Sequence, residues 1–214
     1  MEKSNPKTIA TAERTPLTDE EKDGRPARTA SKNRSGHSGE EPFDLVVIGG
    51  GVGGLVAASG AAQWGAKVAL IEKESLGGDC LHYGCVPTKT LIRSAKIASL
   101  LRRSEEFGLE KTGLQVNFPK VMERMRSVQA EIGKNDDPER FRKMGVQVIF
   151  GSGSFLDPHT FEVNGERVRG QKFLLATGSR PVMLPIPGLQ EAGTLTNVTA
   201  LQLDYLPKSL LILG

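Results

Sequence analysis

Residues 43–74 read FDLVVIGGGVGGLVAASGAAQWGAKVALIEKE, and this stretch decides the fold. Residues 43–48 form an apolar run rich in Val and Ile, which is typical of a strand buried on both faces of a parallel sheet. Small apolar residues at helical spacing follow over residues 53–64, and a second apolar run covers residues 67–72. The stretch therefore predicts a strand, a helix and a second parallel strand, which together make a βαβ unit.

A glycine-rich turn joins the first strand to the helix. Gly49, Gly51 and Gly54 form the pattern G-x-G-x-x-G, and Gly53 adds a further glycine. In such turns the first glycine permits the tight turn, the second lets the backbone approach a pyrophosphate, and the third allows close helix–strand packing. The helix N-terminus favours the pyrophosphate anion. Glu72 ends the second strand, where an acid hydrogen-bonds a ribose diol. We therefore expect a dinucleotide site.

The remainder of the chain continues the α/β pattern. It predicts a helix over 87–103, a helical stretch over 118–144 that breaks near NDDP, a strand at 146–150, antiparallel strands within 151–168 and a buried strand at 172–176. The expected fold is α/β: a doubly wound, Rossmann-like domain with a small antiparallel β insertion.

Length and charge narrow the class of protein. With 214 residues and a net charge of +3, the chain can bury a core and is too near neutral to indicate nucleic-acid binding. No apolar run reaches the ~18 residues that a membrane span needs, and no signal-peptide pattern is present, so we expect a cytoplasmic protein.

Residues 1–41 are poor in apolar residues and are expected to form a disordered tail. Residues 42–208 would form the nucleotide-binding domain. Residues 209–214, which end in LLILG like LVVIG at 45–49, would begin a second one.

The two cysteines of the chain lie in GGDCLHYGCVPTKTL, residues 77–91. A zinc site needs about four ligands at short spacings, and here only His82 lies between Cys80 and Cys85. The spacing is compatible both with buried, unreactive cysteines and with a redox disulfide. In a regular helix, residues five apart have Cα atoms about 8.7 Å apart, whereas a disulfide needs less than about 7 Å. If the two bond, the segment between them is not a straight helix, and Gly84 supplies the backbone freedom.

Cys85 also lies near the start of the helix that Pro87 is expected to open. The helix dipole stabilises a thiolate there. His82 is expected to have a packing or surface role. The basic residues of the helix are expected to be its solvated face: Arg93, Lys96, Arg102 and Arg103.

Three motifs in this order, VVIGGGVGG, IEKESLGGDCLHYGCVPTK and ATGSRP, resemble the flavoprotein disulfide reductases over residues 43–214. The resemblance implies that the dinucleotide is FAD and that Cys80 and Cys85 form the active-site disulfide beside the flavin. It implies that Cys80 is the interchange thiol that meets the substrate, that Cys85 is the charge-transfer thiol, and that Lys89 lies near flavin N5. It implies further cofactor contacts from Lys73, Gly78, Asp79, Gly153, Thr177 and Gly178. Asp79 departs from the pattern, since threonine is commonest there.

The same resemblance implies a reaction. Electrons would pass between NAD(P)H, the flavin and the Cys80–Cys85 disulfide to a small-molecule disulfide or an Hg(II)-type metal ion, with NAD(P)H bound only by the full-length enzyme. Full-length family members are homodimers, and the residues CLHY between the cysteines resemble the mercuric-reductase-like members. A competing hypothesis is a catalytically incomplete FAD-binding fragment or a redox-responsive flavin module, because no second glycine fingerprint follows Gly214.

Overall fold

The computed structural model describes residues 41–111 and 113–213. The predicted tail at 1–41 therefore lies outside the described residues, except for Glu41.

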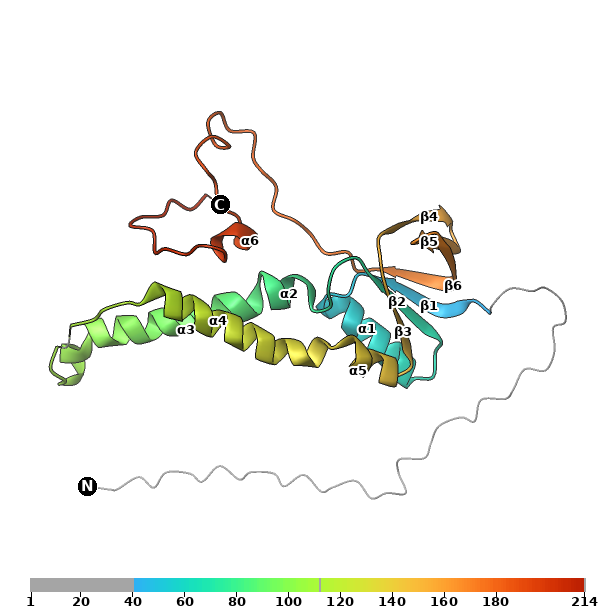
Figure 1. The fold of residues 1–214 in the computed structure, drawn as a ribbon, viewed down its shortest axis with the longest axis horizontal. Coiled ribbons are helices and arrows are strands. Elements are labelled where there is room, and N and C mark those ends of the chain that lie inside the picture. Colours follow the sequence, from blue (N-terminus) through green and yellow to red (C-terminus); the bar gives the residue numbers. More distant parts are fainter. Residues whose placement is uncertain (1–40, 112, 214) are drawn as a thin grey trace, which may run out of the picture. The chain divides into compact units, whose positions relative to one another are not determined.

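A six-stranded sheet organises the described chain (Figure 1). Its order is β3-β2-β1-β6-β5-β4. The strands are β1 (Phe43–Ile48), β2 (Val68–Glu72), β3 (Val146–Phe150), β4 (Gly153–Asp157), β5 (Thr160–Val163) and β6 (Glu166–Leu175). The helices are α1 (Val52–Gln63), α2 (Gly78–His82), α3 (Cys85–Arg102), α4 (Phe118–Gly133), α5 (Pro138–Lys143) and α6 (Asn197–Ala200), with 3₁₀ turns η2 (Ser104–Phe107) and η3 (Lys134–Asp136). The prediction of a Rossmann-like α/β domain is confirmed.

Four of the strands are parallel, and the antiparallel part grows out of one of them. β1 pairs in parallel with both β2 and β6, and β2 pairs in parallel with β3. The first half of β6 pairs antiparallel with β5, and β5 pairs antiparallel with β4. The sequence predicted a separate strand at 172–176. The structure instead continues one strand from the antiparallel ladder into the parallel one, because Gly170 lets it pack against Val46 without a side chain in the way.

The two faces of the parallel sheet are covered differently. On one face, Leu55 and Ala58 of α1 and Phe141 of α5 pack on Val47 and Leu70. On the other face, apolar side chains from the antiparallel strands take the place of helices and meet Val46, Ala69 and Ile71: Phe161, Val163 and Val168. This cover leaves the carboxyl ends of the parallel strands open, which is where ligands bind in such sheets.

The helices α3 and α4 run side by side as a hairpin (Figure 1). α3 begins at Cys85, two residues before the predicted start at Pro87. The predicted break near NDDP is confirmed: Asp137 caps α5 by accepting a hydrogen bond from the Glu139 amide, and Pro138 occupies the first helical position. None of the described helices is long and apolar enough to cross a bilayer.

Residues 209–213 are not a strand in this structure, although the sequence predicted the first strand of a second domain there. A strand forms only when a neighbour pairs with its backbone. No described segment pairs with these residues, and their apolar side chains are exposed, Leu211 by 85%. The assignment of this segment to a second domain stays a prediction.

Gly54 gives the first test of the fold. A Cβ on Gly54 would overlap the carbonyl oxygen of Gly49, whereas a Cβ on Gly60 of the same helix would meet nothing within 4 Å. We expect Gly54→Ala to destabilise the domain by about 2 kcal/mol or more, because the turn cannot relax without losing its hydrogen bonds. Gly60→Ala is the matched control and should stabilise it by roughly 0.5 kcal/mol. Urea unfolding followed by circular dichroism measures both, and equal stability of the two variants would contradict this packing.

Candidate active site

The glycine-rich turn places the α1 N-terminus at the carboxyl edge of the sheet. Gly49 has a φ of +108°, and its amide donates to the Ile71 carbonyl at 2.8 Å. A Cβ on Gly49 would overlap the Ala176 carbonyl oxygen, so only glycine fits between β1 and the end of β6. The first turn of α1 contains no acidic residue and has no side-chain cap. No carboxylate of this turn opposes the positive end of the helix dipole, which therefore favours an anion.

Glu72 is held in place by backbone amides. Its Oε2 accepts a hydrogen bond from the Gly50 amide at 2.6 Å, and its Oε1 accepts one from the Glu74 amide at 2.8 Å. These bonds orient the carboxylate beside the glycine turn. Each oxygen keeps a further lone pair, so the group can still accept from a diol.

The segment that carries the cysteines is fastened to the same turn. The Gly77 amide donates to the Gly50 carbonyl at 2.9 Å, and Gly51 and Gly77 form an isolated parallel bridge. A Cβ on Gly78 would lie 2.6 Å from the Gly51 Cα, so the two backbones touch. Gly77 and Gly78 both have positive φ, which allows this contact without a side-chain clash. The glycine pair before the cysteines therefore joins the cysteine-bearing segment to the glycine-rich turn.

A cavity of about 320 Å³ opens at this edge. Residues that follow each of the four parallel strands line it: Gly49 after β1, Lys73 after β2, Gly153 after β3 and Thr177 after β6. The predicted cofactor residues that line it are Gly49, Gly51, Glu72, Lys73, Gly78, Asp79, Gly153, Thr177 and Gly178. The structure thus brings together four segments that are far apart in the sequence.

Five predicted site residues lie outside this cavity: Gly53, Gly54, Cys80, Cys85 and Lys89. Gly54 acts in packing, and a Cβ on Gly53 would meet nothing within 4 Å.

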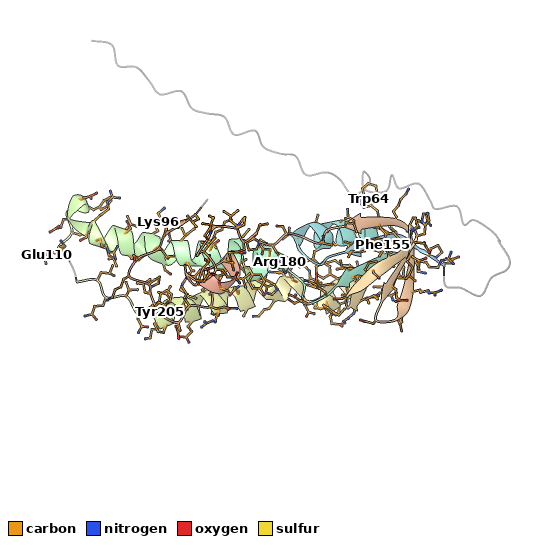
Figure 2. The ribbon with its side chains drawn as sticks, turned by 90° about the horizontal axis from the view of Figure 1, so that it is seen from above. Trp64, Lys96, Glu110, Phe155, Arg180 and Tyr205 are labelled. Carbon is orange, nitrogen blue, oxygen red and sulfur yellow. The ribbon has the colours of Figure 1, made fainter. Side chains whose placement is uncertain are left out.

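The lining residues that sequence reasoning did not assign to the cofactor include His82, Tyr83 and Arg180. Arg180, which Figure 2 labels, follows the ATGS turn directly, so its place in the ATGSRP motif was the available signal. His82 binds the turn before α2, since its Nε2 lies 3.0 Å from the Leu76 carbonyl oxygen and 3.1 Å from the Ser75 hydroxyl.

The two thiols lie close together because the helix between them is broken. α2 ends at His82, Gly84 has φ −123° and ψ −111°, and α3 begins at Cys85. The path is therefore not a straight helix, as a disulfide requires. Both cysteines are free thiols, and Cys85 is close enough to Cys80 to raise the pKa of its thiol.

Two side chains from distant segments hold α2. Gln129 of α4 donates to the carbonyl oxygens of Leu81 and His82 at 3.1 and 3.0 Å. Asn197 of α6 lies 3.5 Å from both Asp79 Oδ1 and the Tyr83 carbonyl oxygen. Both contacts steady the segment just before the second cysteine.

Cys85 is exposed and Cys80 is partly buried. Cys85 is thus the more exposed thiol, but a flavin bound over it would cover it. The assignment of Cys80 as the thiol that meets the substrate therefore stays a prediction. The hydrogen bond to Cys85, burial and the charge of Cys85 raise the pKa of the Cys80 thiol. A backbone hydrogen bond with Cys85 and, to a smaller extent, the Lys89 ammonium act in the opposite direction and lower that pKa. Lys89 is thus close enough to act on the dithiol electrostatically.

The titration of Cys80 tests this arrangement. Cys85→Ala removes the largest cause that raises the Cys80 pKa, so Cys80 should ionise at a lower pH than in the parent chain. Lys89→Gln removes a cause that lowers it and should move the titration to higher pH. The rate of Cys80 alkylation by iodoacetamide against pH, read by peptide mass, measures both. Shifts of the same sign in the two variants would contradict the arrangement.

The residues of the 320 Å³ cavity fit a dinucleotide on three counts. The glycine backbones leave room that a Cβ would fill, the α1 N-terminus offers the positive end of its dipole, and Glu72 offers an oriented acceptor. Among the described residues, no group of three His, Cys, Asp or Glu side chains is placed to hold a metal ion.

Comparison with known proteins agrees with this geometry. The profile of the family described as pyridine nucleotide-disulphide oxidoreductase matches residues 43–214. Dihydrolipoyl dehydrogenase from Bacillus subtilis (strain 168) is 40% identical over 185 residues, which cover 80% of this chain and 39% of the relative. Mercuric reductase from Staphylococcus aureus is 32% identical over 184 residues, which cover 86% and 34%.

A solved structure is similar as well. The Cu(II) complex of the HOCl-induced flavoprotein disulfide reductase RclA from Escherichia coli has a TM-score of 0.62 at 29% identity, over 76% of this chain and 34% of that one. The chain spans roughly a third to a half of the length of these relatives. On the match over residues 43–214, the chain belongs to the pyridine nucleotide-disulphide oxidoreductase family.

Proposed function

We propose that residues 43–214 bind FAD and use the Cys80–Cys85 pair as a redox disulfide in electron transfer between NAD(P)H and a substrate. The observation that carries this proposal is the backbone contact of Gly78 with Gly51. It fastens the thiol-bearing segment to the turn that fits a dinucleotide, so the nucleotide and the dithiol belong to one site.

Each group of the chain has a defined task in this proposal. The α1 N-terminus receives the pyrophosphate, and Glu72 accepts the hydroxyls of the adenosine ribose. FAD, when bound, supplies two-electron transfer between the nicotinamide and the dithiol. Lys89 favours the thiolate form, since its charge lowers the pKa of the Cys80 thiol. The contacts from Gln129 and Asn197 keep the two thiols in place during exchange.

The dithiol carries two electrons. When both thiolates give up one electron each, an S–S bond forms between Cys80 and Cys85, and a disulfide substrate is cleaved into two thiols that take up two protons. A pair of thiolates is also a suitable ligand set for a soft metal ion such as Hg(II). The relatives include a dihydrolipoyl dehydrogenase and a mercuric reductase. The proposed substrates are therefore a small-molecule disulfide or dithiol, or an Hg(II)-type ion. NAD(P)H as electron donor, a homodimeric assembly and a cytoplasmic location belong to the same proposal.

Flavin titration tests the proposal. FAD fluorescence should be quenched saturably on addition of the chain, and the bound flavin should survive gel filtration. Glu72→Gln should weaken binding roughly tenfold, because a charge-assisted hydrogen bond to the ribose becomes a neutral one. Glu166→Gln, an exposed change of the same kind on β6, is the control and should leave affinity unchanged. The circular dichroism spectrum of Glu72→Gln should match that of the parent chain, so that weaker binding reflects the lost hydrogen bond and not misfolding. Absence of saturable quenching in the parent chain would refute the assignment of FAD.

A further inference from the structure

His82 ends α2, the short helix that precedes α3 (Figure 1). In the sequence it stands between Cys80 and Cys85. Its Nε2 lies 3.0 Å from the Leu76 carbonyl oxygen and 3.1 Å from the Ser75 hydroxyl oxygen. A carbonyl oxygen only accepts hydrogen bonds, so Nε2 carries the hydrogen and donates it. The contact therefore assigns the Nε2–H tautomer to the neutral ring.

The carbonyl that His82 binds belongs to the peptide group that fastens α2 to the glycine-rich turn. The Leu76 carbonyl and the Gly77 amide are the two ends of one planar peptide unit. That amide donates to the Gly50 carbonyl oxygen at 2.9 Å, and the Gly50 amide donates to Glu72 Oε2 at 2.6 Å. A row of hydrogen bonds therefore links His82, between the two thiols, to the carboxylate that is proposed to hold the ribose.

The loop before α2 is mostly exposed. Of its residues 73–76, only Leu76 is buried. Glu74 and Ser75 line two cavities, the one at the carboxyl edge of the sheet and a second one of about 430 Å³. His82 lines both cavities as well. Because cavities flank this loop, its position depends more on hydrogen bonds than on packing.

The helix α2 is too short to hold its own shape. It has five residues, and no described side chain caps it at Gly77. The Leu81 amide lies 3.4 Å from the Gly77 carbonyl oxygen, which is long for a hydrogen bond. Helices shorter than about 12 residues are marginal without outside contacts. Gln129 supplies such contacts from α4, and the His82 ring supplies one to the loop.

We propose that His82 is a positioning residue for the dithiol. By binding the Leu76–Gly77 peptide group, it keeps α2 in the arrangement in which Cys80 can bond to Cys85, and so stabilises the disulfide relative to the dithiol. This inference rests on the proposed redox function. A disulfide requires Cα atoms within about 7 Å, whereas two thiols impose no such limit. Loosening α2 lowers the fraction of reduced chain that can close the bond, and the equilibrium constant for closure falls by the same factor.

The equilibrium of the chain with glutathione measures this factor. The reduced chain, without flavin, is incubated in the absence of oxygen at neutral pH with mixtures of glutathione and its disulfide. The Cys80 and Cys85 thiols give two electrons and two protons to one glutathione disulfide, so the bond between them forms and two glutathione thiols are released. After acid quenching and alkylation, intact mass counts open and closed chains.

Three single variants separate positioning from general stability. His82→Leu removes the donor and should lower the equilibrium constant about fivefold, the contribution of one typical hydrogen bond. This change raises the potential of the dithiol by about 20 mV. His82→Gln keeps an N–H donor and should stay within about twofold of the parent chain.

His159→Leu is the matched control. It makes the same substitution at a ring whose Nδ1 lies 3.3 Å from the Gly170 carbonyl oxygen, between β4 and β5. It should leave the equilibrium constant unchanged. The circular dichroism spectrum of each variant should match that of the parent chain.

The parent chain supplies a second test of the same contact. Nitrogen NMR shifts of the His82 ring are measured at about pH 8.5, above the usual range of imidazole titration. They should show a protonated Nε2 and an unprotonated Nδ1. This readout holds even if His82→Leu does not fold.

An equilibrium constant for His82→Leu equal to that of the parent chain would overturn the proposal. An equally large loss in His82→Gln or in His159→Leu, or an Nδ1–H tautomer in the parent chain, would overturn it as well. A parent chain that forms no intrachain disulfide at any glutathione ratio refutes the proposed redox pair itself. A parent chain that forms the disulfide, with no effect of His82→Leu, retains the proposed function without this positioning role.

Discussion

The backbone contact between Gly78 and Gly51 is the constraint on which the rest of the site depends. It leaves no space for a side chain, and both Gly77 and Gly78 adopt positive φ to make it. One consequence is that the start of α2 lies directly on the turn that opens α1. The glycine-rich turn and the thiol-bearing segment are therefore positioned by one another, and neither can shift without breaking the Gly77–Gly50 hydrogen bond.

The break between α2 and α3 is the second constraint on the site, because it changes the path between the two thiols. A continuous helix would hold Cys80 and Cys85 too far apart to bond. Gly84 interrupts the helical path with non-helical backbone angles, and α3 then starts at Cys85 with the positive end of its dipole beside the thiol. Lys89, one turn along, adds a formal charge that opposes the effects raising the pKa of the Cys80 thiol. Backbone geometry thus sets the path between the two cysteines, and the groups around Cys80 set the direction in which the pKa of its thiol moves.

Much of this was predictable from the sequence, and the exceptions have physical causes. The β1–α1–β2 unit was predictable because strands buried on both faces are apolar throughout, and the break between the cysteines because a disulfide cannot span a straight helix. The continuous β6 was not predictable, because it depends on Gly170 meeting Val46 of a strand more than a hundred residues earlier. The solvated face expected for Arg93, Lys96, Arg102 and Arg103 is confirmed, since all four are exposed. The contact of Arg124 with the Thr90 carbonyl oxygen was hidden, because it arises from the packing of α3 on α4. Residues 209–213 are not paired as a strand among the described residues, and their assignment to a second domain stays a prediction, because an apolar run specifies a strand only where a partner edge exists.

The central claim is that the chain carries a reversible intrachain disulfide, and counting its thiols tests this most directly. Intact-mass measurement after alkylation, on samples poised with a mild disulfide oxidant and then with a reductant, reports how many of the two cysteines are free in each state. We predict that the oxidised chain takes up no alkyl group, stays monomeric on a non-reducing gel, and takes up two alkyl groups after reduction. Two alkyl groups in both states, or oxidation only to dimers linked between chains, would contradict it.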